Sequence, residues 1–307
     1  MRLATVQRGQ KEIAAVVLEG DAGPGALPVD ELERLSGLRF PRDLLTIIRE
    51  QLFPHLLQAA EAAAGRTGLP LIPLGQARFA PPYRHPAKIW GIGLNYREHA
   101  ADLDEEAPQN EPGTFFKPAT AIIGPGEPIR LPPVSNKVTA EAELGLIIGR
   151  TARDVSPEEV PGIVFGYTLV IDMTAEDILR RNPRFLTRAK SFDTFFSFGP
   201  WIVTADEVTD PLSLRVETVH NGRIAAQNAV ANMIHRPWEI VAYLSQSTTL
   251  LPGDIISTGT PGAVPIRPGD TVGCRISGLG ELTNPVAGPA PGTSHKEGPP
   301  AAERGAS

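Results

Sequence analysis

The feature that most constrains the fold is the frequency of glycine and proline. The chain has 30 glycines and 31 prolines among 307 residues, and they are spread along the sequence rather than gathered in one linker. Both residues interrupt helices and favour turns. Short apolar runs lie between them, which predicts many short strands. The stretch 287–307 has almost no apolar side chains to bury, so we expect it to be a disordered tail.

The first 80 residues are predicted to form a small N-terminal α+β domain. Residues 1–25 alternate weakly between apolar and polar and are expected to form a strand or hairpin. An apolar stripe then predicts one helix that starts near Pro41, is kinked at Pro54 and stops at Gly65. Repeated prolines follow, and we place the domain boundary in this connection.

Residues 81–286 are predicted to form one β-rich catalytic domain. The pair Asn221-Gly222 lies between two alternating runs and is typical of a hairpin. One helix is expected to start near Thr174, with Asp177 as its capping-box partner, and another at Pro237. The expected strands are KIWGIGLNY, TAIIG, ELGLIIG, IVFGYTLVI, PWIVT, LRVETVHNGRIAAQ, DIISTG and TVGCRIS.

Charge and cysteine content restrict the partners. The formal net charge is −6, without a basic run at either end, which argues against nucleic acid and anionic membranes as partners. The longest apolar runs are far shorter than the roughly 20 residues of a membrane helix. The single cysteine, Cys274, has no partner for an internal disulfide, and the N-terminal stretch does not look like a signal peptide. We therefore expect a cytoplasmic protein.

Three acidic residues form a candidate metal site. Glu141 and Glu143 are two apart in a predicted strand, so their side chains leave the same face. The strand continues into an apolar run, and adjacent anions near such a core repel unless a cation lies between them. Asp172 ends another apolar run. Three carboxylates suit a hard cation: Mg²⁺ first, then Mn²⁺ or Ca²⁺. An ordinary solvent-facing strand edge is the alternative.

His99 is a candidate general base, because histidine titrates near neutral pH and Asp102 would be its neighbour on a helical turn. The alternative is a solvated histidine in an acidic loop. Other catalytic motifs are missing: GIGLNY has Tyr96 where a dinucleotide-binding loop needs its third glycine, and the sequence contains no P-loop, HExxH or GxSxG pattern.

Taken together, these segments resemble the fumarylacetoacetate hydrolase family, in its acylpyruvase-like and 2-hydroxyhepta-2,4-diene-1,7-dioate isomerase-like branch. The resemblance spans about 88–286 and is carried by KIWGIGLNYREHA, FFKPATAIIGPGEPIRLP, AEAELGLIIGR, VFGYTLVIDMTAED, AKSFDTFFSFGPWIVT, HNGR and LLPGDIISTGTPG. It implies an α+β, β-rich fold, namely a mixed β-sandwich roll with a small N-terminal domain. It also implies a homodimer.

The resemblance also implies roles for individual residues. Mg²⁺ or Mn²⁺ would be held by Glu141, Glu143 and Asp172, and His99 and Asp102 would lie on a lid over the metal. Lys190 would contact the substrate or its developing charge. Thr260 would line the pocket, and Lys117 is a further candidate for substrate binding.

The sequence departs from the family pattern in three ways. Asp102 stands where hydrolytic members usually have glutamate. Glu176 and Leu179 stand where an arginine and a glutamine are common, and GAVPI replaces a glycine-valine-glycine step. Glu176 would repel a substrate carboxylate, and Arg180 or Arg181 could compensate for this repulsion. The alternative is that Glu176 only stabilises the helix, because an acidic side chain in the first turn interacts favourably with the helix dipole.

The expected activity is metal-dependent hydrolysis of the carbon-carbon bond of a 1,3-dicarbonyl compound, such as an acylpyruvate. The expected ligand is thus a small 2-oxo acid or 1,3-diketone. An alternative that uses the same metal-enolate chemistry is decarboxylation of oxaloacetate, or isomerisation or hydration of a 2-hydroxymuconate-type dienoate. A second alternative is a catalytically silent member that kept the fold.

Overall fold

The computed structural model describes residues 1–98 and 109–289. His99, Asp102 and most of the predicted tail lie outside the described residues. Ala287, where that tail was expected to begin, is the last residue of a strand.

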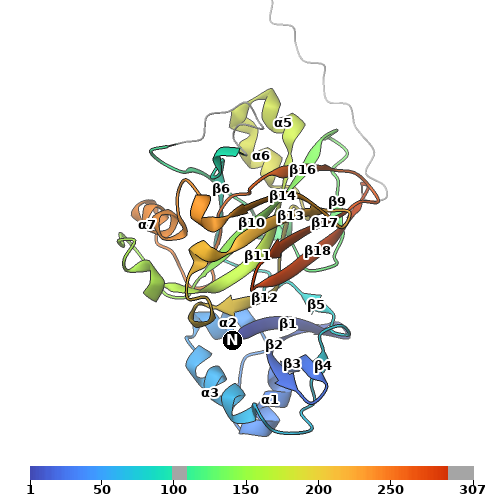
Figure 1. Ribbon diagram of the computed structural model, residues 1–307, viewed down its shortest axis with the longest axis vertical. Helices are drawn as coiled ribbons and strands as arrows, with labels where there is room; N and C mark the ends of the chain where they lie inside the picture. Colours follow the sequence, from blue (N-terminus) through green and yellow to red (C-terminus); the bar gives the residue numbers. More distant parts are fainter. Residues whose placement is uncertain (99–108, 290–307) are drawn as a thin grey trace, which may run out of the picture.

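The chain folds mainly into two β-sheets, as Figure 1 shows. The larger sheet has the order β4-β3-β2-β1-β12-β11-β10-β15-β6-β7, and β16, β5 and β8 pair with β10, β1 and β12. Its strands are β1 (Arg2–Arg8), β2 (Lys11–Gly20), β3 (Gly23–Pro28), β4 (Ile72–Pro73), β5 (Phe79–Ala80), β6 (Ile89–Gly93), β7 (Gly113–Phe116), β8 (Ile122–Ile123), β10 (Val138–Ile148), β11 (Val164–Ala175), β12 (Phe196–Thr204), β15 (Ile255–Ser257) and β16 (Ala263–Ile266).

The smaller sheet has the order β14-β13-β17-β18-β9. Its strands are β9 (Ile129–Arg130), β13 (Arg215–His220), β14 (Arg223–Ala229), β17 (Thr271–Ile276) and β18 (Gly280–Ala287). The α-helices are α1 (Val29–Ser36), α2 (Leu44–Arg49), α3 (Phe53–Ala63), α5 (Glu176–Arg181), α6 (Leu186–Lys190) and α7 (Pro237–Ser247). The prediction of a β-rich α+β fold is confirmed.

The antiparallel pair β10 and β11 lies at the centre of the molecule. Every residue of β10 is buried. One of its faces packs with the smaller sheet, since Leu144 shares a hydrophobic cluster with Val216 and Cys274. On the other face, Ile147 belongs to the cluster that contains the helices of the N-terminal region. Two covered faces explain the nearly continuous apolar character of both strands.

The N-terminal region extends the larger sheet. The predicted hairpin is confirmed as β1 and β2, and β1 pairs antiparallel with β12, where Leu3 lies opposite Ile202. Figure 1 shows α1 and α3 beside β1–β4 at one end of the molecule, with α5 and α6 at the opposite end.

The prediction of one kinked helix in this region is wrong. The chain forms α2 and α3 instead, and Gln51, with φ of 56°, interrupts the helical path between them. Asp43 begins α2, because its carboxylate accepts a hydrogen bond from the Thr46 backbone N–H at 2.9 Å. Pro54 lies in the first turn of α3, where its missing N–H leaves no helical bond unmade.

The helix expected near Thr174 is present as α5, but its predicted capping box is wrong. Strand β11 continues through Ala175, and α5 begins at Glu176. Asp177 does not cap the helix in a capping box; its carboxylate accepts hydrogen bonds from Ser135 Oγ and the Asn136 backbone N–H.

Two local predictions are confirmed. Helix α7 begins at Pro237. Asn221 and Gly222 connect β13 to β14, and their φ values of 49° and 77° lie in the left-handed region that this short hairpin turn needs. None of the helices in the described part of the chain is long and apolar enough to cross a membrane.

Candidate active site

The three predicted acids meet at the end of the central strand pair. Glu141 on β10 lies directly opposite Asp172 on β11, and Glu143 is two residues further along β10. One carboxylate oxygen from each lies within 4.8 Å of the others, and all three residues are buried. Three buried carboxylate oxygens at this spacing fit a hard divalent cation. Among residues 1–98 and 109–289, this is the one group of three or more such side chains arranged to hold a metal.

Two lysines lie against the carboxylates. Lys190, at the end of α6, donates to Glu141 Oε2 at 2.7 Å and to Asp172 Oδ2 at 2.6 Å. Lys117, directly after β7, donates to the other oxygen of Asp172 and, at 3.1 Å, to the Met173 carbonyl. The lysines thus balance much of the negative charge that the three acids bring into the interior.

The pKa directions follow from this burial. Burial raises the pKa of Glu143 to about 8, and repulsion by Asp172 adds to the increase. Burial lowers the pKa of Lys117 to about 8, although Asp172 opposes the decrease. For Lys190 burial also acts to lower the pKa, but the combined attraction of Asp172, Glu141 and Glu143 outweighs burial and raises the pKa. A divalent cation in this cluster would favour the ionised form of Glu143.

Hydroxyl groups orient the carboxylates. Ser257 Oγ and the Gly259 backbone N–H donate to Glu143 Oε2 at 2.5 and 2.8 Å. Thr174 Oγ1 donates to Glu141 Oε1 at 2.9 Å. From the sequence alone, Ser257 was given no role and Thr174 was considered only as the start of a helix. Ser257 directly follows the apolar residues Ile255 and Ile256. A hydroxyl residue at the end of an apolar run is the pattern that could have indicated Ser257 as a site residue.

The carboxylates open into a cavity of about 750 Å³. Of the predicted site residues, those that line it are Glu141, Glu143, Glu176, Arg180, Lys190 and Thr260. Asp172 and Lys117 are buried beside the cavity and are not among its lining residues. The positions of the predicted base His99 and of Asp102 lie outside the described residues.

Glu176 is paired with two cations. Lys137 Nζ lies 2.8 Å from Glu176 Oε1, and Arg180 Nε lies 2.6 Å from the same oxygen. The Glu176 side chain is 10% exposed, against 61% for Arg180. Of the two arginines that were considered as compensation, Arg180 is therefore the one that contacts Glu176 and lines the cavity.

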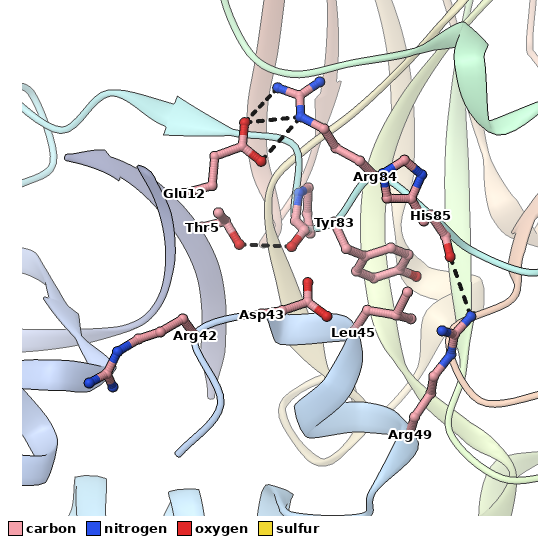
Figure 2. A pocket seen from close by; sticks show the side chains of 10 residues that line it. Thr5, Glu12, Arg42, Asp43, Leu45, Arg49, Tyr83, Arg84 and His85 are labelled. Carbon is pink, nitrogen blue, oxygen red and sulfur yellow. Dashed lines mark hydrogen bonds and ion pairs between the residues drawn. The ribbon is translucent and has the colours of Figure 1, made fainter. Parts of the chain in front are cut away.

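A second, smaller cavity of about 280 Å³ lies beside the N-terminal region. Figure 2 shows Arg84 paired with Glu12 on one side and Arg49 donating to the His85 carbonyl on the other. Arg84 also contacts Glu127 at 2.8 Å. These charges pair mainly with one another, so the larger cavity is the candidate active site.

Comparison with known proteins agrees with this assignment. The profile described as "Fumarylacetoacetate (FAA) hydrolase C-terminal" matches residues 88–287. A similar solved structure is maleylpyruvate hydrolase from Sphingobium sp. SYK-6 in complex with manganese (II) ion and pyruvate, with 32% identity over 94% of this chain and 100% of that one and a TM-score of 0.77.

Two further proteins are similar along most of the chain. The structure of 5-carboxymethyl-2-hydroxymuconate delta-isomerase from Mycobacterium smegmatis has 33% identity, covers 94% of this chain and 100% of that one, and has a TM-score of 0.73. The mitochondrial oxaloacetate tautomerase Fahd2a of Rattus norvegicus is 33% identical over 93% of this chain and 91% of its own length. From these matches and the carboxylate cluster, the chain belongs to the fumarylacetoacetate hydrolase family.

Proposed function

We propose that the protein is a divalent-metal-dependent hydrolase that cleaves the carbon-carbon bond of a 1,3-dicarbonyl, acylpyruvate-type small molecule. The observation that carries the proposal is the buried carboxylate cluster, contacted by Lys190, at the inner end of a cavity of about 750 Å³. The similar maleylpyruvate hydrolase, which was crystallised with manganese and pyruvate, supports it.

Glu141, Glu143 and Asp172 would hold the cation, for which we propose Mg²⁺ or Mn²⁺. When bound, such an ion supplies positive charge that stabilises oxyanions and enolates. Lys190 lines the cavity, and its ammonium group, which contacts Glu141 and Asp172, would stabilise the oxygen that becomes negative. Thr260 offers a hydroxyl in the same cavity.

We assign the proton transfer to His99, oriented by Asp102. His99 would take a proton from water while the hydroxide oxygen bonds to the acyl carbonyl carbon. The bond from that carbon to the pyruvyl methylene then breaks, and its electron pair leaves as pyruvate enolate. A proton returns to the methylene carbon, so that the products are a carboxylic acid and pyruvate.

The second candidate function is enolate chemistry without attack by water. It is favoured by the similarity to oxaloacetate tautomerase along 93% of the chain and to a muconate isomerase structure. In this case oxaloacetate would be decarboxylated or tautomerised, or a 2-hydroxymuconate-type dienoate isomerised or hydrated, at the same carboxylate cluster.

The test is the loss of acetylpyruvate enol absorbance by metal-stripped protein, with and without Mg²⁺ or Mn²⁺, with product identification. Metal-dependent formation of pyruvate and acetate supports the hydrolase. The variants Glu141→Gln and His99→Ala should each lower this turnover at least 100-fold. Carbon dioxide release from oxaloacetate, or an isomer without cleavage, would instead support the second candidate.

We also propose that the protein acts in the cytoplasm as a homodimer and that residues 1–80 form its N-terminal domain. The pairing of β1 with β12 joins that region to the larger sheet. Sedimentation analysis would measure the oligomeric state.

A further inference from the structure

The outer part of the large cavity differs in character from its inner end. The inner end carries the carboxylates, Lys190 and several threonines. The rest of the lining, which we call the outer part, is largely apolar. Its apolar residues come from two segments of the chain: Leu179, Pro183 and Leu186 after β11, and Ile92, Leu94 and Phe115 around β6 and β7. We propose that this outer part binds an uncharged, apolar acyl group, and that Leu179 and Leu186 determine this specificity. The inference rests on the proposed function, because it names the class of acylpyruvate that would be cleaved.

One apolar side comes from the helices that follow β11. Leu179 lies on α5 and Leu186 begins α6, with Pro183 between them. Both leucines are partly buried and line the cavity, and Leu179 also packs against the main hydrophobic cluster.

The other apolar side comes from β6 and β7. Ile92 lies on β6, Leu94 directly follows this strand, and Phe115 lies on β7; all three line the cavity. The Phe115 ring also lies under Lys190, with Nζ 4.7 Å from the ring centroid. A flexible alkyl chain that starts near Lys190 would therefore be enclosed by apolar surface, and each buried methylene should strengthen binding about fourfold.

The charged groups in this part of the cavity disfavour an anion. Glu176 lines the cavity and is itself negative. Arg180, one of two cations among the described residues that line the cavity, is bonded to Glu176 through Nε, and Lys137 pairs with the same carboxylate oxygen. A substrate carboxylate beside Arg180 would also lie close to the negative Glu176 carboxylate, and it would lose water against Leu179 and Leu186.

The first experiment compares two substrates that differ only at the chain end. Butanoylpyruvate ends in a methyl group where succinylpyruvate has a carboxylate. With metal-loaded wild-type protein we expect kcat/KM for butanoylpyruvate to exceed that for succinylpyruvate at least tenfold. We also expect it to exceed that for acetylpyruvate roughly tenfold, since two methylenes are added.

Variants test the assignment to the leucines. Leu179→Gln and Leu186→Gln should each reduce the butanoyl-to-acetyl ratio of kcat/KM at least threefold, and Leu179→Arg should raise kcat/KM for succinylpyruvate. Leu251→Gln is the matched control, because Leu251 is 39% exposed and does not line the cavity. An unchanged ratio in the first two variants would overturn the assignment, as would a wild-type preference for succinylpyruvate.

A binding measurement separates failure of this inference from failure of the proposed function. Calorimetry with the Mn²⁺-loaded protein compares 2-oxohexanoate with 2-oxoadipate, which has a terminal carboxylate in place of the methyl group. Neither has a 1,3-dicarbonyl bond to cleave. At least tenfold tighter binding of 2-oxohexanoate supports the inference even if no acylpyruvate is hydrolysed, and tighter binding of 2-oxoadipate contradicts it even if the hydrolase is real.

Discussion

Ser257 donates a hydrogen bond to Glu143, with 2.5 Å between Ser257 Oγ and Glu143 Oε2. The two residues are far apart in sequence and meet because β15 pairs with β10, where Ser257 lies opposite Gly145. The Gly259 backbone N–H donates to the same oxygen. One oxygen of Glu143 is thus held in place, and the carboxylate is oriented toward Glu141 and Asp172.

This contact predicts that Ser257 supports metal binding indirectly. Ser257→Ala should weaken Mn²⁺ binding about tenfold, because loss of a hydrogen bond to a ligand typically costs 10-fold to 100-fold in affinity. Calorimetric titration of metal-stripped protein measures this. Ser197→Ala is the matched control: it removes a buried hydroxyl that donates to Asn284 at 2.8 Å, and should leave Mn²⁺ affinity unchanged. Equal affinities for both variants would contradict the role of Ser257.

Lys190 should stabilise the metal-free cluster. Its replacement in Lys190→Met leaves Glu141 and Asp172 without a buried cation that contacts both, so the metal-free variant should lose about 3 kcal/mol of unfolding free energy. Added Mn²⁺ should restore part of this loss, and the rise in Tm on metal addition should exceed that of the wild type.

The comparison for Lys190 is Lys88→Met, which breaks the 2.8 Å pair with buried Asp254 away from the cluster. Thermal unfolding is followed with chelator and with saturating Mn²⁺. The metal-induced increase in Tm for Lys88→Met should equal that of the wild type. If Lys190→Met also showed the wild-type increase, the electrostatic role of Lys190 would be refuted.

Local patterns in the sequence predicted much of the fold and part of the site. Alternation along β10 placed Glu141 and Glu143 on one face, and the hairpin at Asn221 follows from backbone preferences of two residues. These features depend on neighbours in sequence, which is why a single sequence reveals them.

Other features depend on contacts between distant segments, which local patterns do not reveal. The meeting of Glu141 with Asp172 is set by strand register, and Lys117 reaches Asp172 only because β7 joins the edge of the same sheet. The break between α2 and α3 lies at Gln51, whose amide donates to the Gly149 carbonyl at 2.7 Å. Such a tertiary contact overrides helix propensity and leaves no local pattern.

Asp270 should make stability depend on pH in the acidic range. Hydrogen bonds from Asn221 and His220 lower its pKa to about 2 from 3.8. The stabilisation is therefore present above about pH 4 and is lost as pH falls toward 2. Asp270→Asn should reduce the unfolding free energy at pH 6 by about 1 kcal/mol or less, given solvent screening. Urea unfolding from pH 6 to pH 3 should show the difference from wild type decreasing, whereas exposed Asp193→Asn should show no difference.

The close pairing of β11 with β12 makes Gly166 sensitive to substitution. A Cβ atom there would lie 2.3 Å from the Val203 carbonyl oxygen, which is backbone and has little freedom to move. Gly166→Ala should therefore force the two strands apart and lower the unfolding free energy by about 2 kcal/mol or more. Gly75→Ala is the matched control, since a Cβ there meets no heavy atom within 4 Å. Because β11 also carries Asp172, Gly166→Ala should in addition weaken Mn²⁺ binding. If the variant had the wild-type stability and the wild-type Mn²⁺ affinity, the close packing of β11 against β12 would be refuted.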